Sequence, residues 1–266
     1  MDNQTILIAF LLTLFAGLST GIGGLIALIA KRTNTNFLSF ALGLSAGVMI
    51  YVSFMEMLPM SIDALTDVFG EKKGMLYLIL SFFGGIASIA LIDFLVPKQS
   101  NPHELQGVED MKKKRTNGLK QTGVVLAVTI AIHNFPEGIA TFMSAQASLE
   151  VALPITAAIA IHNIPEGIAV SVPIYHATGS KKKAFWLSLL SGLAEPLGAL
   201  IAYFFLMPFW SSTLNAVVLA AVAGVMVFIS LDELLPSAEK YGKHHLSIIG
   251  VVIGMGIMAM SLYLFI

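Results

Sequence analysis

Long apolar segments constrain the fold of this chain more than any other feature. Each is of a length that can cross the hydrocarbon core of a bilayer as an α-helix, which takes about 20 residues. Glycine pairs such as Gly43/Gly47 and Gly250/Gly254 suit close packing of those helices. The pattern predicts an all-α integral membrane protein with eight transmembrane helices in a single polytopic domain over 1–266. The eight predicted spans cover approximately residues 5–30, 37–58, 74–96, 122–145, 152–174, 184–207, 214–235 and 246–266.

Composition excludes several other classes of protein. Hydrophobic residues make up 56% of the chain and charged residues 12%, which leaves too little polar surface for a soluble domain. The chain has no cysteine, so disulfides, thiolate nucleophiles and thiolate metal ligands are excluded. We expect the lipid bilayer as a partner, no nucleic acid and no resident cofactor.

Lysine and arginine are distributed unevenly between the connections of the predicted helices. If the N-terminus lies outside, thirteen of them fall in cytoplasmic loops and two, Lys72 and Lys73, in outer loops. Cytoplasmic loops of membrane proteins are enriched in these residues. The sequence therefore predicts a multi-pass protein of the cell (inner) membrane with both termini outside, on the periplasmic side. The polar segment 97–121 is predicted to be a flexible cytoplasmic loop, and the N-terminal apolar run an uncleaved first helix.

One sequence of eleven residues occurs twice, in the two central predicted helices. It runs from Ile130 to Ala140 and from Ile159 to Ala169, and the copies differ only at Phe135 and Ile164. Ionisable groups are costly at membrane depth, so their duplication indicates a functional site. The polar residues that the copies place inside apolar segments are His133, Asn134 and Glu137, and His162, Asn163 and Glu166.

The spacing within each copy favours a metal site. His133 and Glu137 are four residues apart, as are His162 and Glu166, so each pair lies on one helix face. Imidazole, carboxylate and amide groups suit zinc, iron(II), manganese or cobalt better than copper(I). Because the two helices are predicted antiparallel neighbours, the copies meet at mid-depth, where Glu137 and Glu166 could bridge two cations. Satisfied structural histidines are the alternative.

Further carboxylates extend this hypothesis. Glu195, followed by Pro196, lies in the middle of the sixth predicted span, where a metal could serve as its partner; a protonated glutamate bonded to a carbonyl is the alternative. Glu56, Asp232 and Glu233 are predicted near helix ends, Glu56 toward the outside and the other two toward the cytoplasm. They are candidates for a metal entrance and exit, or ordinary interfacial carboxylates.

A second repeat relates the second and seventh predicted spans. Residues 47–59 are similar to residues 224–236, and the two segments share a glutamate, a leucine and a proline at their ends. The two spans run in opposite directions. The similarity predicts a 3+2+3 arrangement with inverted repeats and a substrate site near the midplane; chance similarity of apolar helices is the alternative.

The paired H-N-x-P-E-G motif, Glu195 and the eight predicted spans resemble the ZIP (Zrt-, Irt-like) family of divalent metal transporters, and most closely a bacterial zinc-transporting group within it. The resemblance implies uptake of zinc, and of metals such as iron(II), manganese and cobalt, by a protein that is not an enzyme; a homodimer is possible. It implies a zinc-type site at His133, Glu137, His162 and Glu166. It implies an adjoining iron-type site at Asn134, Glu137, Asn163, Glu166 and Glu195.

Two other functions are compatible with buried metal ligands. An intramembrane metal-dependent hydrolase would need a metal-bound water and a general base. Its familiar helical motif, H-E-x-x-H, differs from the motif in this chain. A metal exporter would use the same ligands, so the direction of transport rests on the resemblance alone.

Overall fold

The computed structural model describes residues 3–29, 35–95, 119–241 and 244–265, and all of the elements within these ranges are helical. The all-α class predicted from the sequence is thus confirmed. The helices, in which η denotes a π-helix or a 3₁₀ turn, are α1 (Asn3–Ile29), α2 (Thr35–Val52), η1 (Ser53–Met57), α3 (Leu58–Phe69), α4 (Glu71–Leu95), α6 (Leu119–Ala147), α7 (Leu149–Thr178), α8 (Lys181–Gly192), α9 (Ala194–Ile201), η2 (Ala202–Leu206), η3 (Met207–Phe209), α10 (Ser212–Ile229), η4 (Ser230–Leu234), α11 (Leu235–Tyr241) and α12 (His244–Phe265).

Seven helical segments within the described ranges are long and apolar enough to cross a membrane. Helix α6, 29 residues long, would be the eighth, but the side chains of residues 119–130 lie outside the described residues. The loop predicted over 97–121 also lies outside them, except for residues 119–121, which begin α6. The seven segments are Asn3–Ile26, Asn36–Phe69, Glu71–Phe94, Leu149–Val172, Lys181–Phe209, Ser212–Glu239 and His244–Leu264.

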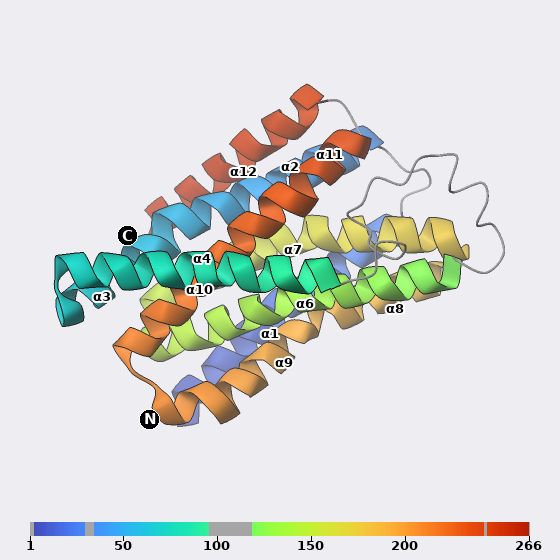
Figure 1. The fold of residues 1–266 in the computed structure, drawn as a ribbon. Coiled ribbons are helices and arrows are strands. Elements are labelled where there is room, and N and C mark those ends of the chain that lie inside the picture. The colour runs from blue at the N-terminus through green and yellow to red at the C-terminus, as the bar shows by residue number, and fades with distance from the viewer. Residues whose placement is uncertain (1–2, 30–34, 96–118, 242–243, 266) are drawn as a thin grey trace.

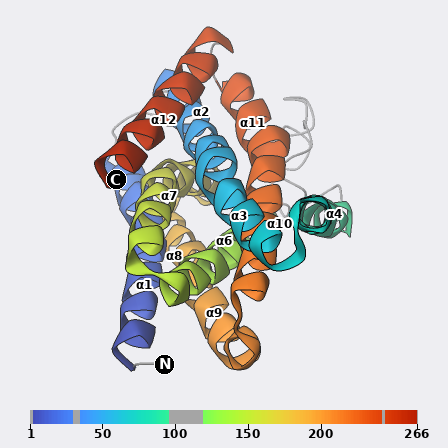
Figure 2. The ribbon, with the colours of Figure 1, turned by 90° about the vertical axis from the view of Figure 1, so that its left-hand side faces the viewer.

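The helices form two sets that lie side by side. One set contains α2, α4, α10 and α12 with the short helices α3 and α11, and the other contains α1, α6, α7, α8 and α9. Figure 2 looks at one end of the bundle, with α12, α2, α10 and α4 across the upper and right parts and α1, α7, α8 and α9 below. Helix α7 contacts α2, and α6 contacts α10, across the boundary. Helices α6 and α7, which carry the repeated motif, therefore lie where the two sets meet.

Glycines bring α2 and α12 into backbone contact. Gly43 and Gly47 lie against the carbonyls of Ser247 and Val251, and a methyl group added at either glycine would overlap those carbonyl oxygens. The same holds for Gly250 and Gly254 against α2. The close packing expected for these glycine pairs is confirmed.

The second and seventh predicted spans continue past their prolines. Helix runs from α2 through η1 and α3 to Phe69, and from α10 through η4 and α11 to Tyr241. A π-turn precedes each proline: the N–H of Leu58 donates to the Ser53 carbonyl, and that of Leu235 to the Ser230 carbonyl. The wider turn accommodates a proline ring that would clash with the carbonyl four residues earlier in a regular α-helix.

This continuity corrects the placement of three candidate residues. Glu56 lies in η1, and Asp232 and Glu233 lie in η4, so all three are inside long helices. The prediction that they sit near helix ends was wrong, because a proline that follows a π-turn does not end its helix.

Candidate metal centre

Three side chains of the repeated motif converge between α6 and α7. Glu137, His162 and Glu166 each offer a ligand atom, and these atoms lie within 4.8 Å of one another. The side chains are 2%, 0% and 9% exposed. Among the described residues this is the one group of three or more histidine and carboxylate side chains close enough to hold a metal ion.

The hydrogen bonds of His162 define its tautomer. Its Nδ1 lies 3.0 Å from the Ala158 carbonyl oxygen, which can only accept, so Nδ1 carries a proton and donates it to that carbonyl. Its Nε2 lies 3.1 Å from Oε1 of Glu137. A nitrogen and an oxygen bound tetrahedrally to one zinc ion at ordinary bond lengths would be about 3.4 Å apart. A small separation of the two side chains would therefore admit zinc.

Asn163 and Glu195 form a second polar group beside the first. The amide nitrogen of Asn163 donates to the Ala16 carbonyl of α1, at 2.8 Å, and to the Glu195 carboxylate of α9. Asn163 and Glu195 are both fully buried. The sequence predicted that Glu195 needs a partner, and Asn163 is one.

Several buried oxygens in these two groups accept no hydrogen bond from the described part of the chain. They are Oε2 of Glu137, Oδ1 of Asn163 and Oε2 of Glu195. Buried polar atoms without hydrogen-bond partners are uncommon in proteins, and they can mark the place where an ion binds. These oxygens are therefore available as ligands for a cation.

The structure gives less detail for the other two polar residues of the first motif copy, His133 and Asn134. Asn134 is fully buried on α6, on the same side of the helix as Glu137. His133 belongs to the backbone of α6, but its side chain lies outside the described residues. Whether it faces His162 therefore stays a prediction.

The candidate entrance and exit residues differ in their relation to the centre. Glu233 is close enough to Glu166 for their charges to interact, as are Glu137 and Glu195. Asp232 is exposed, and Glu56 is partly buried in η1 and does not belong to the group of three. Glu233 thus lies close to Glu166 of the centre.

Close backbone contacts hold the helices that carry the centre. Gly138 lies against the Glu195 carbonyl of α9, and Gly167 against the Thr20 carbonyl of α1. Each of these glycines directly follows a glutamate of the centre. The sequence analysis assigned no role to these glycines. Their presence at the same position in both copies of the motif could have indicated one.

Two serines also support the centre and were missed. The Ser188 hydroxyl of α8 donates to the Thr20 and Gly167 carbonyls, at 3.2 and 3.1 Å. The Ser45 hydroxyl of α2 donates to the His162 carbonyl at 3.3 Å. No sequence pattern distinguishes these serines from the others in the apolar segments.

Comparison with known proteins identifies relatives along the whole chain. The family model described as "ZIP Zinc transporter" matches residues 97–262. The chain is 59% identical over 264 residues to the zinc transporter ZupT of Streptococcus mutans, covering 99% of this chain and 100% of the relative. It is 58% identical over 268 residues to ZupT of Oceanobacillus iheyensis, covering 99% of each. It is 55% identical over 281 residues to ZupT of Clostridium perfringens, covering 100% of this chain and 99% of the relative.

Proposed function

This chain belongs to the ZIP family of zinc transporters, and we propose that it transports zinc across the membrane, into the cytoplasm, through the centre between α6 and α7. The observation that carries the proposal is the convergence of Glu137, His162 and Glu166 in a buried position. Zinc binds imidazole nitrogen and carboxylate oxygen, and a site with few protein ligands can release its ion. His133 is proposed as a further ligand.

A second, oxygen-rich subsite adjoins the first in this proposal. Asn134, Asn163 and Glu195 would hold a second cation, with Glu137 and Glu166 bridging the two. The unpaired oxygens of Asn163 and Glu195 support this arrangement. Amide and carboxylate oxygens suit iron(II), manganese and cobalt as well as zinc, so we propose these metals as additional substrates.

A cation at this position would also balance the buried charge. Glu137, Glu166 and Glu195 are near enough to interact electrostatically, and like charges at short range destabilise one another in a medium of low dielectric constant. A divalent ion between them offsets this repulsion. Glu233, near Glu166, is proposed to receive the ion on its way to the cytoplasm, with Asp232 beyond it, and Glu56 is proposed to lie on the entrance route.

The proposed architecture is an inverted repeat of three helices on either side of α6 and α7. The matching π-turns η1 and η4, each followed by a proline, support this relation between the second and seventh spans. Both termini are proposed to face outward from the inner membrane. Helix α1 begins and α12 ends at one end of the bundle, whereas Lys181–Lys183 begin α8 at the other end (Figure 1). Homodimer formation stays a prediction.

Uptake of radioactive zinc by a cell that lacks its own zinc importers tests this function. The wild-type chain should accumulate zinc, and Glu137→Ala and Glu166→Ala should each lower the initial rate at least about a hundredfold, because each removes a ligand shared by both ions. Glu150→Ala is the matched control, since Glu150 is an exposed glutamate at the start of α7. Its rate should equal that of the wild type.

Two results would contradict the proposal. Near-wild-type uptake by either glutamate variant, at equal abundance in the membrane, would exclude the shared site. Loss of zinc from preloaded cells that express the wild-type chain, without uptake, would identify an exporter.

A further inference from the structure

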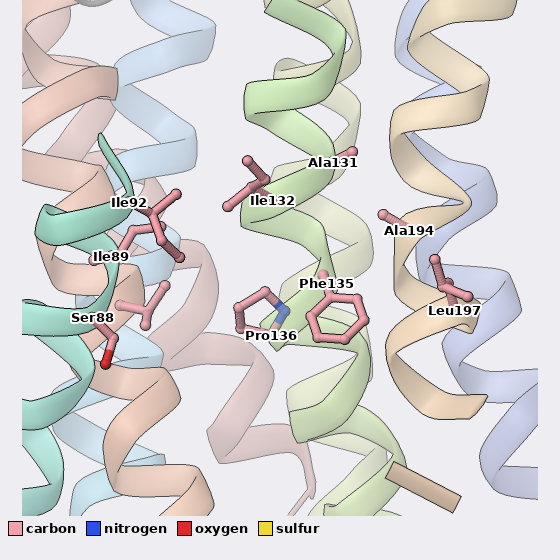
Figure 3. Close-up of a pocket in the computed structure, with 10 residues that line it drawn as sticks. Ser88, Ile89, Ile92, Ala131, Ile132, Phe135, Pro136, Ala194 and Leu197 are labelled. Carbon is pink, nitrogen blue, oxygen red and sulfur yellow. The ribbon is translucent and has the colours of Figure 1, made fainter. Parts of the chain in front are cut away.

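An apolar crevice lies over the outer face of α6, away from the metal centre. It has a volume of about 440 Å³ and is bordered by α4 on one side and α9 on the other (Figure 3). Val225 of α10 also lines it. In Figure 3, Ile132 and Pro136 lie on the side of α6 that faces α4, and Ala131 and Phe135 on the side toward α9. The crevice thus covers the turn of α6 that contains Asn134, one of the proposed ligands.

The borders of the crevice are held apart by the way in which the helices pack. Helix α4 is joined to α10 through Gly85 and Gly224, whose Cα atoms lie against backbone carbonyls of the opposite helix. Helix α9 is joined to α6 through Gly198 and Gly138 in the same manner. The substantial contacts of α4 among the described helices are with α3 and α10, so α4 does not close onto α6 or α9. Figure 2 shows α4 at the edge of the bundle.

The lining offers almost nothing to a polar ligand. Ser88 is the one residue of the lining with a polar side chain, and its hydroxyl donates to the Gly84 carbonyl at 2.7 Å. Cavities whose walls lack polar partners do not hold ordered water. The apolar lining therefore favours a hydrocarbon ligand.

The position of the crevice determines which hydrocarbon can reach it. Ile92 and Leu197, on its two borders, are 40% and 53% exposed, so it opens on the side of the bundle. The lining lies within helices of membrane-spanning length, where the surroundings are lipid. A helix from a second copy of the chain is too large to enter, since a helix of about 10 Å diameter and 30 Å length occupies roughly 2,400 Å³.

We propose that this crevice is a binding site for one acyl chain of a membrane phospholipid. The chain would enter between α4 and α9 and pack against Ile132, Phe135 and Pro136 on the back of the motif helix. Its methylene groups would restore the dispersion contacts that an empty space of this size forfeits. The site binds the acyl chain and not the headgroup. We therefore expect it to bind phospholipids regardless of their headgroup. The proposal does not depend on whether a metal ion is bound at the centre.

Native mass spectrometry of the full-length protein, purified in detergent with palmitoyl-oleoyl-phosphatidylglycerol, tests the proposal. Ala131→Phe places a ring inside the crevice. Ala87→Phe is the matched control, because Ala87 is an exposed alanine of α4 that does not line the crevice. We expect the wild type and Ala87→Phe to retain one phospholipid per chain that Ala131→Phe loses, with all three eluting as folded particles on size exclusion. If Ala131→Phe does not fold, Ala131→Leu replaces it.

Several outcomes would overturn the proposal. Equal numbers of retained lipids in Ala131→Phe and Ala87→Phe, or no lipid on the wild type, would show that lipids contact this face only transiently. A dimer that Ala131→Phe alone converts to monomers, with lipid number unchanged, would assign the surface to a second copy.

A second measurement distinguishes lipid from water. The chain has no cysteine, so Ser88→Cys introduces a single thiol into the lining. In membranes we expect a water-soluble maleimide to label it at least about tenfold more slowly than Lys72→Cys, since thiols react as thiolates, which need water. Equal labelling rates would indicate a water-filled crevice and would contradict the proposal.

Discussion

At the scale of single residues, the imidazole and the amide of the second motif copy make different contacts. Nε2 of His162 faces Glu137, whereas the amide of Asn163 is anchored to Ala16 and Glu195. The side chains are adjacent in sequence, but they contact different carboxylates. If the two proposed subsites exist, substitution of one side chain at a time should separate them.

The first prediction concerns selectivity. His162→Ala should lower zinc uptake about tenfold more than iron(II) uptake, because imidazole contributes more to zinc binding than to binding of a harder ion. Asn163→Ala should do the reverse, because it removes an oxygen donor and releases Glu195. Initial rates with each metal, normalised to the amount of protein in the membrane, check this. Equal losses of both metals in both variants would mean that the subsites are not separable.

The sequence indicated the types of these residues but not all of their partners. His162, Asn163 and Glu166 could be selected as candidates because ionisable groups are costly at membrane depth, so a duplicated polar motif in an apolar segment favours a functional site over structural histidines. The Ala16 carbonyl that binds Asn163 could not be predicted, since every residue has a carbonyl and only the packing of α1 selects this one. The side chain of His133 remains a prediction.

At the scale of helices, close backbone contacts fix the positions of the side chains in the centre. Gly138 on α6 approaches the carbonyl of Glu195, which is itself a proposed ligand on α9. A side chain at position 138 would separate these helices and move Glu195 away from Asn163. The glycine thus connects helix packing to the geometry of the centre.

The second prediction tests this contact. Gly138→Ala should destabilise the protein by about 1–3 kcal/mol, the usual range for overpacking, and should lower iron(II) uptake through the displaced Glu195. Gly256→Ala is the control, because a Cβ at Gly256 meets no atom within 4 Å. Thermal unfolding in detergent, followed by size-exclusion chromatography, measures the stability, and initial rates of iron(II) uptake measure the transport. An unchanged unfolding temperature for Gly138→Ala would show that α6 and α9 can separate at no cost.

The interruptions of the long helices were predicted only in part. The sequence predicted helix ends near Pro59 and Pro236, but the π-turns η1 and η4 carry the helix past them. The sixth predicted span, in contrast, is divided at Leu193 into α8 and α9, just before Glu195 and Pro196. A proline in the sequence does not indicate whether the helix forms a π-turn or breaks. We infer that the packing of neighbouring helices decides between the two.

The third prediction concerns the π-turn of the second span. Pro59→Ala restores an N–H that can donate to a carbonyl four residues earlier, so the turn should revert toward α-helix. Glu56 would then rotate relative to α3, and zinc uptake should fall if Glu56 lies on the entrance route. Pro208→Ala, in the exposed 3₁₀ turn η3, is the control. Uptake equal to that of the wild type in Pro59→Ala would argue against a role for this turn.

At the scale of the whole molecule, membrane orientation determines which face of the centre meets which compartment. The distribution of lysine and arginine predicts that the connection between α3 and α4 faces outward and that the start of α8 faces the cytoplasm. The described helices place these two positions at opposite ends of the bundle (Figure 1). The prediction of which compartment each end faces rests on charge alone, since the described helices carry no other feature that marks the outside.

The last prediction tests that orientation with single cysteines in a chain that has none of its own. Lys72→Cys, at the start of α4, should be labelled in intact cells by a membrane-impermeant maleimide. Lys182→Cys, in the first turn of α8, should be labelled only after the membrane is opened. Both side chains are exposed, so the difference between them reports the compartment and not burial. The reverse pattern would contradict the proposed orientation, because it would turn Glu233, the proposed exit residue, toward the outside.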